Sequence, residues 1–293
     1  MQKQITKHAA KQFTGKRAAV FVLAAVMTVA FMPAFGTGDA AAAAKPKGRL
    51  VKTVTKQYYD KGTESWVKDY VLSFKYNRRN DPSVITKKAY NDSGNLIDTE
   101  KWTQKYTYKK GKRAKRTEKW TYDAPGSVTK WTYDKYGNPK TNYIKEGSVT
   151  KNIKFNFTKS GYLKSVTYKE VSKDDGTIID KYKYKTSLKK GLATKMTCFY
   201  YDNGTWKKDS ADKFNKKGFI TNYKSGDGAY YHTVKYTYKK GRAASATVTF
   251  YGAIDGVVKE RYKFAYTKKP VKNKRYAKMI NHLIESYDEF AWY

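Results

Sequence analysis

Cysteine is almost absent from this chain of 293 residues, which holds only Cys198. A single cysteine excludes an internal disulfide, although an exported domain could have used one. Cys198 lies in an apolar run at residues 197–201 that is typical of a strand. We therefore expect it to fill a small space in the core rather than to act as a nucleophile.

Histidine is nearly as scarce, and only His232 and His282 follow residue 44. The first lies in a predicted strand and the second in a predicted helix, so the pattern does not indicate a zinc site. The sequence also contains no Gly-x-Ser-x-Gly nucleophile turn and no phosphate-binding glycine loop between a strand and a helix. We expect no metal and no cofactor.

Paired carboxylates are the remaining candidates for acid–base chemistry. Asp174 with Asp175, and Asp209 with Asp212, are close in sequence. Together with His232 they carry the hypothesis of a hydrolase. Acidic residues scattered through turns produce such pairs by chance, so we predict that the protein is not an enzyme.

Acidic side chains are few beside basic ones, with 25 Asp and Glu against 61 Lys and Arg and a formal charge of +36. Without residues 1–44, which hold five basic side chains and Asp39, the charge is +32 over 249 residues. Such a surplus attracts polyanions. Lysine far outnumbers arginine, whose planar fork suits bidentate readout, so the charge indicates a diffuse field. The alternative is that lysine only keeps a solvated face soluble.

The N-terminal segment has the layout of a secretory signal peptide. Five basic side chains precede an apolar run at residues 18–32, and small residues follow at 40–44. The run is shorter than the roughly 18–20 residues that a spanning helix needs. We predict a signal peptide over 1–44, with a retained N-terminal anchor as the alternative. With no lipoprotein cysteine nearby and no apolar C-terminal tail, we expect a secreted protein without a transmembrane anchor.

A repeated phrase organises the remaining chain: aromatics at alternate positions, a short polar turn, then glycine. Examples are Tyr106-Thr107-Tyr108-Lys109-Lys110-Gly111, Phe214-Asn215-Lys216-Lys217-Gly218 and Tyr236-Thr237-Tyr238-Lys239-Lys240-Gly241. A second turn type, in which Asp or Asn stands one or two positions before glycine, recurs around Gly62, Gly176, Gly204 and Gly256. Both glycine turns are typical of tight hairpins. The second type lacks the alternating acidic ligands of a calcium-binding loop.

Strict alternation between the turns predicts strands of a sheet with one wet face. Tyr182 and Tyr184 share one face, and Lys181, Lys183 and Lys185 share the other. The same pattern recurs around Tyr106, Tyr236 and Tyr262. A slip of one residue would exchange the faces, so the pattern fixes the register.

We therefore predict an all-β domain over 45–269, an antiparallel meander of about 14–17 strands in repeated hairpins. Whether the sheet is open and curved or barrel-like is left undecided by the sequence. After Pro270 the apolar residues recur at steps of three and four, which predicts an amphipathic helix over 270–293. Its expected role is to cap the sheet, with membrane-surface or partner binding as the alternative.

The segment Trp131-Thr132-Tyr133-Asp134-Lys135-Tyr136-Gly137-Asn138 resembles the YD-repeat (rearrangement-hotspot-like) family of secreted bacterial proteins. Residues 120–126, Trp-Thr-Tyr-Asp-Ala-Pro-Gly, are similar, and looser copies extend the resemblance over about residues 84–269. The resemblance implies extended β-sheet in a secreted or surface protein. Unit lengths are irregular, and lysine often replaces the aspartate.

Tyr200-Tyr201-Asp202-Asn203-Gly204-Thr205-Trp206 is similar to the choline-binding-like repeats of wall-binding surface proteins. That resemblance implies aromatic hairpins that enclose a quaternary ammonium group or stack on sugars. The paired Gly-Trp steps of that family are missing.

Two sets of residues are candidates for ligand binding. An aromatic platform is predicted at tryptophans near turns or breaks in the alternation, namely Trp102, Trp120, Trp131 and Trp206. A polyanion-binding surface is predicted at the lysines Lys181, Lys183, Lys185, Lys235, Lys239 and Lys240. For each tryptophan, packing in the core is the competing interpretation.

From these features we expect a secreted, non-enzymatic binding or structural module of the bacterial cell envelope. Lysine charge would hold it to an anionic cell-wall polymer, either teichoic acid or an acidic polysaccharide. The alternative is a lipid- or glycan-binding carrier or lectin-like protein that uses an aromatic sheet face. Specific nucleic-acid binding is not expected, because arginine-rich and stacking motifs are missing. The oligomeric state is left open.

Overall fold

A computed structural model describes residues 48–268 and 271, apart from 124, 136–137, 158–162, 190–191, 216–218, 226–227, 240–241 and 254–255. These residues form sixteen antiparallel strands and no helix. The predicted signal peptide at 1–44 lies outside the described residues. So does the predicted helix at 270–293, except for Val271, which forms an isolated bridge to Gly48.

The strands follow one another with short connections. Their bounds are β1 Val51–Asp60, β2 Ser65–Tyr76, β3 Pro82–Tyr90, β4 Leu96–Lys109, β5 Lys112–Trp120, β6 Val128–Tyr133, β7 Pro139–Glu146 and β8 Val149–Phe157. The second half comprises β9 Leu163–Ser172, β10 Ile178–Lys189, β11 Leu192–Asp202, β12 Thr205–Phe214, β13 Ile220–Ser225, β14 Tyr231–Lys239, β15 Arg242–Ala253 and β16 Gly256–Tyr266.

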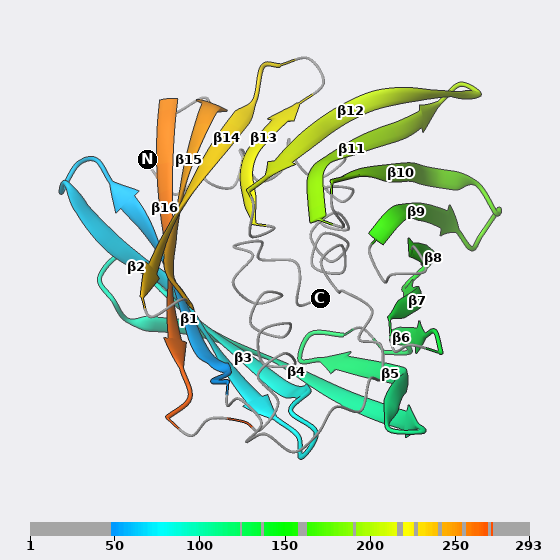
Figure 1. Ribbon diagram of the computed structural model, residues 1–293, viewed down its shortest axis with the longest axis horizontal. Helices are drawn as coiled ribbons and strands as arrows, with labels where there is room; N and C mark the ends of the chain where they lie inside the picture. The colour runs from blue at the N-terminus through cyan, green and yellow to red at the C-terminus, as the bar shows by residue number, and fades with distance from the viewer. Residues whose placement is uncertain are drawn as a thin grey trace.

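Each strand pairs with its neighbours in the chain, and β16 then pairs with β1 to close a barrel. The closing ladder runs from Val51 opposite Tyr266 to Tyr58 opposite Glu260. Figure 1 shows the ring of strands, with β16 in orange beside β1 in blue. The predicted meander and its strand number are confirmed. The sequence did not decide between an open curved sheet and a barrel. The structure is a closed barrel, in which no edge strand remains exposed.

The alternation of the sequence becomes the two faces of the barrel wall. Tyr182 and Tyr184 are 7% and 1% exposed, while Lys183 between them points to the opposite face. The register carries this division around the ring, since Tyr182 faces Tyr200 on β11 and Tyr168 on β9. A barrel encloses one face of its sheet, so the buried aromatic face is the inner face. The opposite, lysine-bearing face is called the outer wall below.

Buried side chains of the inner face form two clusters. The first comes from β6, β8–β11 and β13 and includes Trp131, Tyr168 and Tyr184. The second comes from β1–β4 and β14–β16 and includes Trp102 and Tyr262. The second cluster spans the closing ladder, so apolar packing and the hydrogen bonds between β1 and β16 hold the same seam together.

Successive turns lie at opposite ends of the barrel because every strand reverses direction. The turn after β11 has positive φ at Asn203 (45°) and Gly204 (82°), and the turn after β4 has it at Lys110 (49°) and Gly111 (76°). Positive φ at both central residues matches the twist of a two-residue hairpin. The turns after β1 and β11 share one end, called the Asp–Gly end, and the turn after β4 lies at the other.

We predict that Trp102→Ala lowers the free energy of unfolding by about 3–5 kcal/mol, because Trp102 is only 2% exposed and removal of its indole ring leaves a cavity in the core. The neighbouring change Lys101→Ala removes an exposed side chain of the outer wall and should cost within about 0.5 kcal/mol. Urea denaturation followed by circular dichroism measures both. Equal losses for the two variants would contradict the assignment of faces.

Candidate functional site: the lysine-bearing outer wall

Lysine and threonine occupy most outward positions of the strands. Typical cross-strand neighbours are Lys105 with Thr117, Lys154 with Thr167, and Lys235 with Thr247. Threonine is a good strand former, and it separates ammonium groups that would otherwise face each other. The wall therefore carries a dense positive charge at a small cost in repulsion.

Carboxylates of the described strands lie on the inner face, at strand ends or at bulges, and none occupies an outward register position. Inner examples are Glu118, Glu170 and Asp212, which face Gln104, Lys151 and Met196 across the ladder. Several have cationic partners: Glu260 Oε1 lies 3.0 Å from Lys56 Nζ. The carboxylates of the inner face are thus partly paired with cations, whereas the ammonium groups of the outer wall face solvent.

Among the described strands, four pairs of like charge break the Lys–Thr pattern, of which Lys109–Lys112 and Lys239–Arg242 lie beside hairpin turns and the other two lie in β9–β12. Lys169 faces Lys181 across β9 and β10, and Lys195 faces Lys213 across β11 and β12. Like charges directly opposite destabilise a sheet. We call the outward residues of β9–β12 the lysine sector. Its repulsive pairs do not serve the fold, which makes the sector a candidate binding surface.

Aromatic rings lie among these lysines. Tyr201 and Trp206 face each other across the tight turn, with ring centroids 5.2 Å apart at 65°. Lys183 Nζ lies 4.3 Å from the centroid of Trp206, and Lys181 Nζ lies 4.1 Å from that of Tyr201. Phe199 continues the row beneath Lys183 and Lys185. A cation over an aromatic face gains about 0.5–1 kcal/mol at an exposed site, so the rings hold the ammonium groups in place.

The predicted lysines are distributed over two parts of the wall. Lys181, Lys183 and Lys185 lie together in the lysine sector. Lys235 and Lys239 lie on β14, outside the sector, and both are exposed. Lys240 lies outside the described residues.

The four predicted tryptophans do not form one exposed platform. Trp206 lies on the outer wall, whereas Trp102 and Trp120 stack on each other on the inner face, with centroids 6.0 Å apart and planes 8° from parallel. Trp131 packs on Phe155, with the guanidinium of Arg116 4.3 Å from its ring centroid. Trp102 and Trp131 are only 2% and 5% exposed, which makes them packing residues in this structure.

Sequence reasoning missed Tyr201 and Phe199 as members of the surface. The prediction used only tryptophan, although the hairpin turn at Asn203-Gly204 implies that residue 201 faces residue 206. Strand alternation then places Phe199 on the same side, because it lies two positions before Tyr201.

The candidates for acid–base chemistry occupy structural positions. Asp175 accepts hydrogen bonds from the backbone N–H (2.9 Å) and hydroxyl (2.6 Å) of Thr177, which lowers the pKa of its carboxyl to about 2. His232 stacks on Tyr223 with centroids 5.0 Å apart, and burial lowers the pKa of its imidazole to about 4. Asp212 is 2% exposed on the inner face. Within the described residues, no group of three or more His, Cys, Asp or Glu side chains could hold a metal ion.

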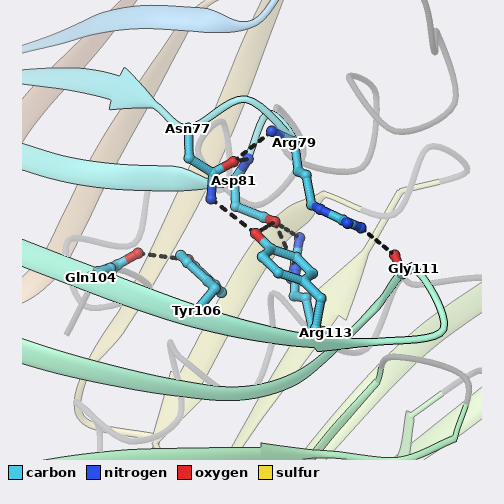
Figure 2. Close-up of polar contacts among 8 residues, drawn as sticks. Asn77, Arg79, Asp81, Gln104, Tyr106, Gly111 and Arg113 are labelled. Atoms are coloured by element: carbon cyan, nitrogen blue, oxygen red, sulfur yellow. Dashed lines mark hydrogen bonds and ion pairs between the residues drawn. The ribbon is translucent and has the colours of Figure 1, made fainter.

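Figure 2 shows the polar network that ties the turn after β2 to the hairpin of β4 and β5. Asp81, 1% exposed, accepts hydrogen bonds from the Tyr108 hydroxyl (2.5 Å) and from Arg113 Nε (2.7 Å). Asn77 caps the turn by accepting from the backbone N–H of Arg79 and of Asp81. Burial and the Asp81 hydrogen bond raise the pKa of Tyr108 to about 12. The groups satisfy one another, so the network stabilises one end of the barrel.

Comparison with known proteins gives a fold but no family. No family model matches the chain, and no curated protein matches it. Among solved structures, a porin-like protein from Bacteroides uniformis matches with a TM-score of 0.53 at 12% identity, covering 74% of this chain and 98% of the other. A porin-like protein from Bacteroides vulgatus matches with a TM-score of 0.36 at 14% identity, covering 75% and 100%.

The first of these comparisons supports the barrel fold. The resemblances to YD repeats and to choline-binding-like repeats stay predictions, because no family model or curated relative tests them. Among the described residues there is no helix of the length and hydropathy needed to cross a bilayer.

We predict that Lys195→Thr stabilises the fold at low ionic strength by about 0.2–1 kcal/mol, because it relieves the repulsion with Lys213. The gain should fade near 1 M salt, where the screening length falls to about 3 Å. Urea denaturation at two salt concentrations measures it. Lys105→Thr is the matched control, since Lys105 already faces Thr117. An equal gain in the control would show that strand propensity, not charge, is responsible.

We also predict that the Cys198 thiol is unreactive in the folded protein. It is 3% exposed, and burial raises its pKa, so little thiolate forms at pH 8. A thiol reagent that releases a light-absorbing product should label Cys198 only after denaturant is added. Rapid labelling under native conditions would place Cys198 outside the core.

Proposed function

We propose that this protein is a non-enzymatic barrel of the cell envelope that binds an anionic polymer through its lysine-bearing outer wall. The observation that carries the proposal is the separation of charge by face. Outward register positions of the described strands hold lysine without a carboxylate, while the inner face holds acids such as Glu118, Glu170 and Glu260.

The arrangement of the lysines supports binding rather than solubility alone. A soluble surface is best served by interspersed charges of both signs. Here the lysine sector instead opposes Lys169 to Lys181 and Lys195 to Lys213. Bound anionic groups would neutralise these pairs. The repulsion that destabilises the free protein would then be relieved in the complex, which favours binding.

The outer wall also bears on where the barrel resides. A transmembrane barrel presents an apolar band about 25 Å tall to lipid, and a lysine at the midplane costs about 2–4 kcal/mol. Lys105, Lys183 and Lys235 lie in the middle parts of their strands on the outward face. The wall is therefore suited to water, and we propose that the barrel is secreted and held at the envelope by charge.

A carrier that uses the aromatic face is less well supported. That face is the inner one, and its large rings are packed: Trp102, Tyr168 and Tyr184 are each at most 2% exposed. A lipid or glycan would have to displace this packing.

Binding of a long polyanion should weaken steeply as salt concentration rises, because each contact releases a counterion. A plot of the logarithm of the association constant against the logarithm of the salt concentration should be a straight line. Its slope is expected to be about −0.7 for each anionic group that a lysine neutralises. Cell-wall fragments and a soluble linear polyphosphate serve as ligands. Binding that does not change with salt would reject the proposal.

Matched triple variants locate the surface. Lys169→Thr, Lys195→Thr and Lys213→Thr remove three exposed charges from the lysine sector. The control removes three exposed lysines from β3–β5, namely Lys88→Thr, Lys101→Thr and Lys119→Thr. The sector variant should bind more weakly than the control. Equal losses would mean that the whole wall acts as a diffuse field.

A further inference from the structure

Two hairpins of the barrel are built alike. The β1–β2 hairpin contains Tyr58-Tyr59-Asp60-Lys61-Gly62-Thr63 and then Trp66, and the β11–β12 hairpin contains Tyr200-Tyr201-Asp202-Asn203-Gly204-Thr205 and then Trp206. The second loop is two residues shorter. Both turns lie at the Asp–Gly end.

The strand registers match residue by residue. Tyr59 faces Trp66, and Tyr201 faces Trp206. Counted from the turn, each ladder shifts after four pairs, with Asp69 skipped in one hairpin and Asp209 in the other. Equal registers and equal bulges show that the two hairpins place their aromatic rings in the same way on the outer wall.

The rings and their cations have the same geometry. Tyr59 and Trp66 have centroids 5.5 Å apart at 67°, against 5.2 Å and 65° for Tyr201 and Trp206. The guanidinium of Arg261 lies 4.2 Å from the Trp66 centroid, in the place that Lys183 takes at 4.3 Å over Trp206.

A second cation lies over each tyrosine. Lys259 Nζ lies 5.8 Å from the Tyr59 centroid, and Lys181 Nζ lies 4.1 Å from the Tyr201 centroid. The residues Tyr59, Trp66, Lys259 and Arg261 are called the first site, and Tyr201, Trp206, Lys181 and Lys183 the second site.

Barrel closure completes the first site. The second site takes its cations from β10, which precedes β11 in the chain. The corresponding strand for β1 is β16, which reaches β1 only through the closing ladder. Gln57 Oε1 accepts hydrogen bonds from Arg261 Nε (3.2 Å) and Nη2 (3.0 Å) across this ladder. The guanidinium is therefore fixed before any ligand arrives.

Each site holds two cations two residues apart on one strand, at a spacing of about 7 Å from strand geometry. Their mutual repulsion favours an anion between them. A cationic ligand such as a quaternary ammonium group would meet the two charges already over the rings. Cations that are held in place lose little freedom on binding, which raises affinity.

We propose that the first and second sites are two equivalent oxyanion-binding sites, through which one barrel engages two anionic groups of a polymer. The inference rests on the proposed function and adds two defined sites on the outer wall, of which only the second lies in the lysine sector. The ligand group is a phosphate, sulfate or carboxylate. Six strand steps separate β11 from β1 by way of β16, or about 29 Å at the usual strand spacing, so one long polymer can reach both sites.

The test uses substitutions that leave the net charge unchanged. Isothermal titration of the protein with a short linear polyphosphate, and separately with a short oligogalacturonate, should show two oligomers bound per barrel. Trp66→Leu and Trp206→Leu should each weaken one of the two about fivefold, the value of one or two exposed cation–π contacts. The double variant should weaken both. Binding of the polyphosphate alone would identify the ligand group as phosphate, and binding of the oligogalacturonate alone would identify it as carboxylate.

Tyr231→Leu is the matched control, because Tyr231 is an exposed outer-wall ring that stacks on Tyr251 with centroids 4.5 Å apart. Thermal unfolding by circular dichroism confirms that each variant folds. Equal affinity of Trp66→Leu, Trp206→Leu and wild type would overturn the inference. Salt-dependent binding of long polymer in that case would leave the proposed function standing, and its loss in wild type would remove both.

Discussion

The ladder between β1 and β16 is the constraint on which the rest of the structure depends. It converts a sheet with two faces into a wall with an inside and an outside, so a periodicity of two in the sequence becomes a separation of rings from ammonium groups. The same ladder completes the second hydrophobic cluster and brings Arg261 over Trp66. Closure thus sets both the packing and the chemistry of the surface.

Stability and charge are balanced differently on the two faces. On the inner face, half-buried acids are partnered: Glu100 Oε1 lies 3.0 Å from Lys87 Nζ, and Glu100 accepts a hydrogen bond from the indole N–H of Trp120. On the outer wall, threonine separates most lysines, and the exceptions among the described strands are two opposed pairs in the lysine sector and two beside hairpin turns. Surface repulsion of this kind is tolerated when packing elsewhere is sufficient, and two aromatic clusters supply that packing.

Much of the fold follows from local chemistry that the sequence displays. Alternation assigned Tyr182 and Lys183 to opposite faces, and glycine turns marked the hairpins. Closure was not predictable, because it depends on contacts between residues about 200 positions apart, such as Val54 with Phe264. The spacing of Lys181, Lys183 and Lys185 predicted that they share one face, and the register of β10 agrees. For Trp102 and Trp131 the sequence offered both ligand contact and core packing, since alternation gives the face of a residue but not which face is enclosed, and the structure buries both.

The duplicated hairpin is visible in the sequence as Tyr-Tyr-Asp followed by glycine and tryptophan. The sequence does not show which cations lie over its aromatic rings. Only the closed ring supplies β16 as the neighbour of β1, and only the registers show that Asp69 and Asp209 are equivalent bulges. Binding at the outer wall therefore depends on lysines that face outward and are available to a ligand.

Acetylation of lysine side chains, followed by mass spectrometry, tests that claim most directly. Lys195 and Lys213 are exposed on the outer wall, while Lys56 is 9% exposed and paired with Asp69 and Glu260 inside. We expect fast acetylation of Lys195 and Lys213, slow acetylation of Lys56, and protection of Lys195 and Lys213 when polyanion is added. Lys56 reacting as fast as Lys195, or no protection by polyanion, would contradict this expectation.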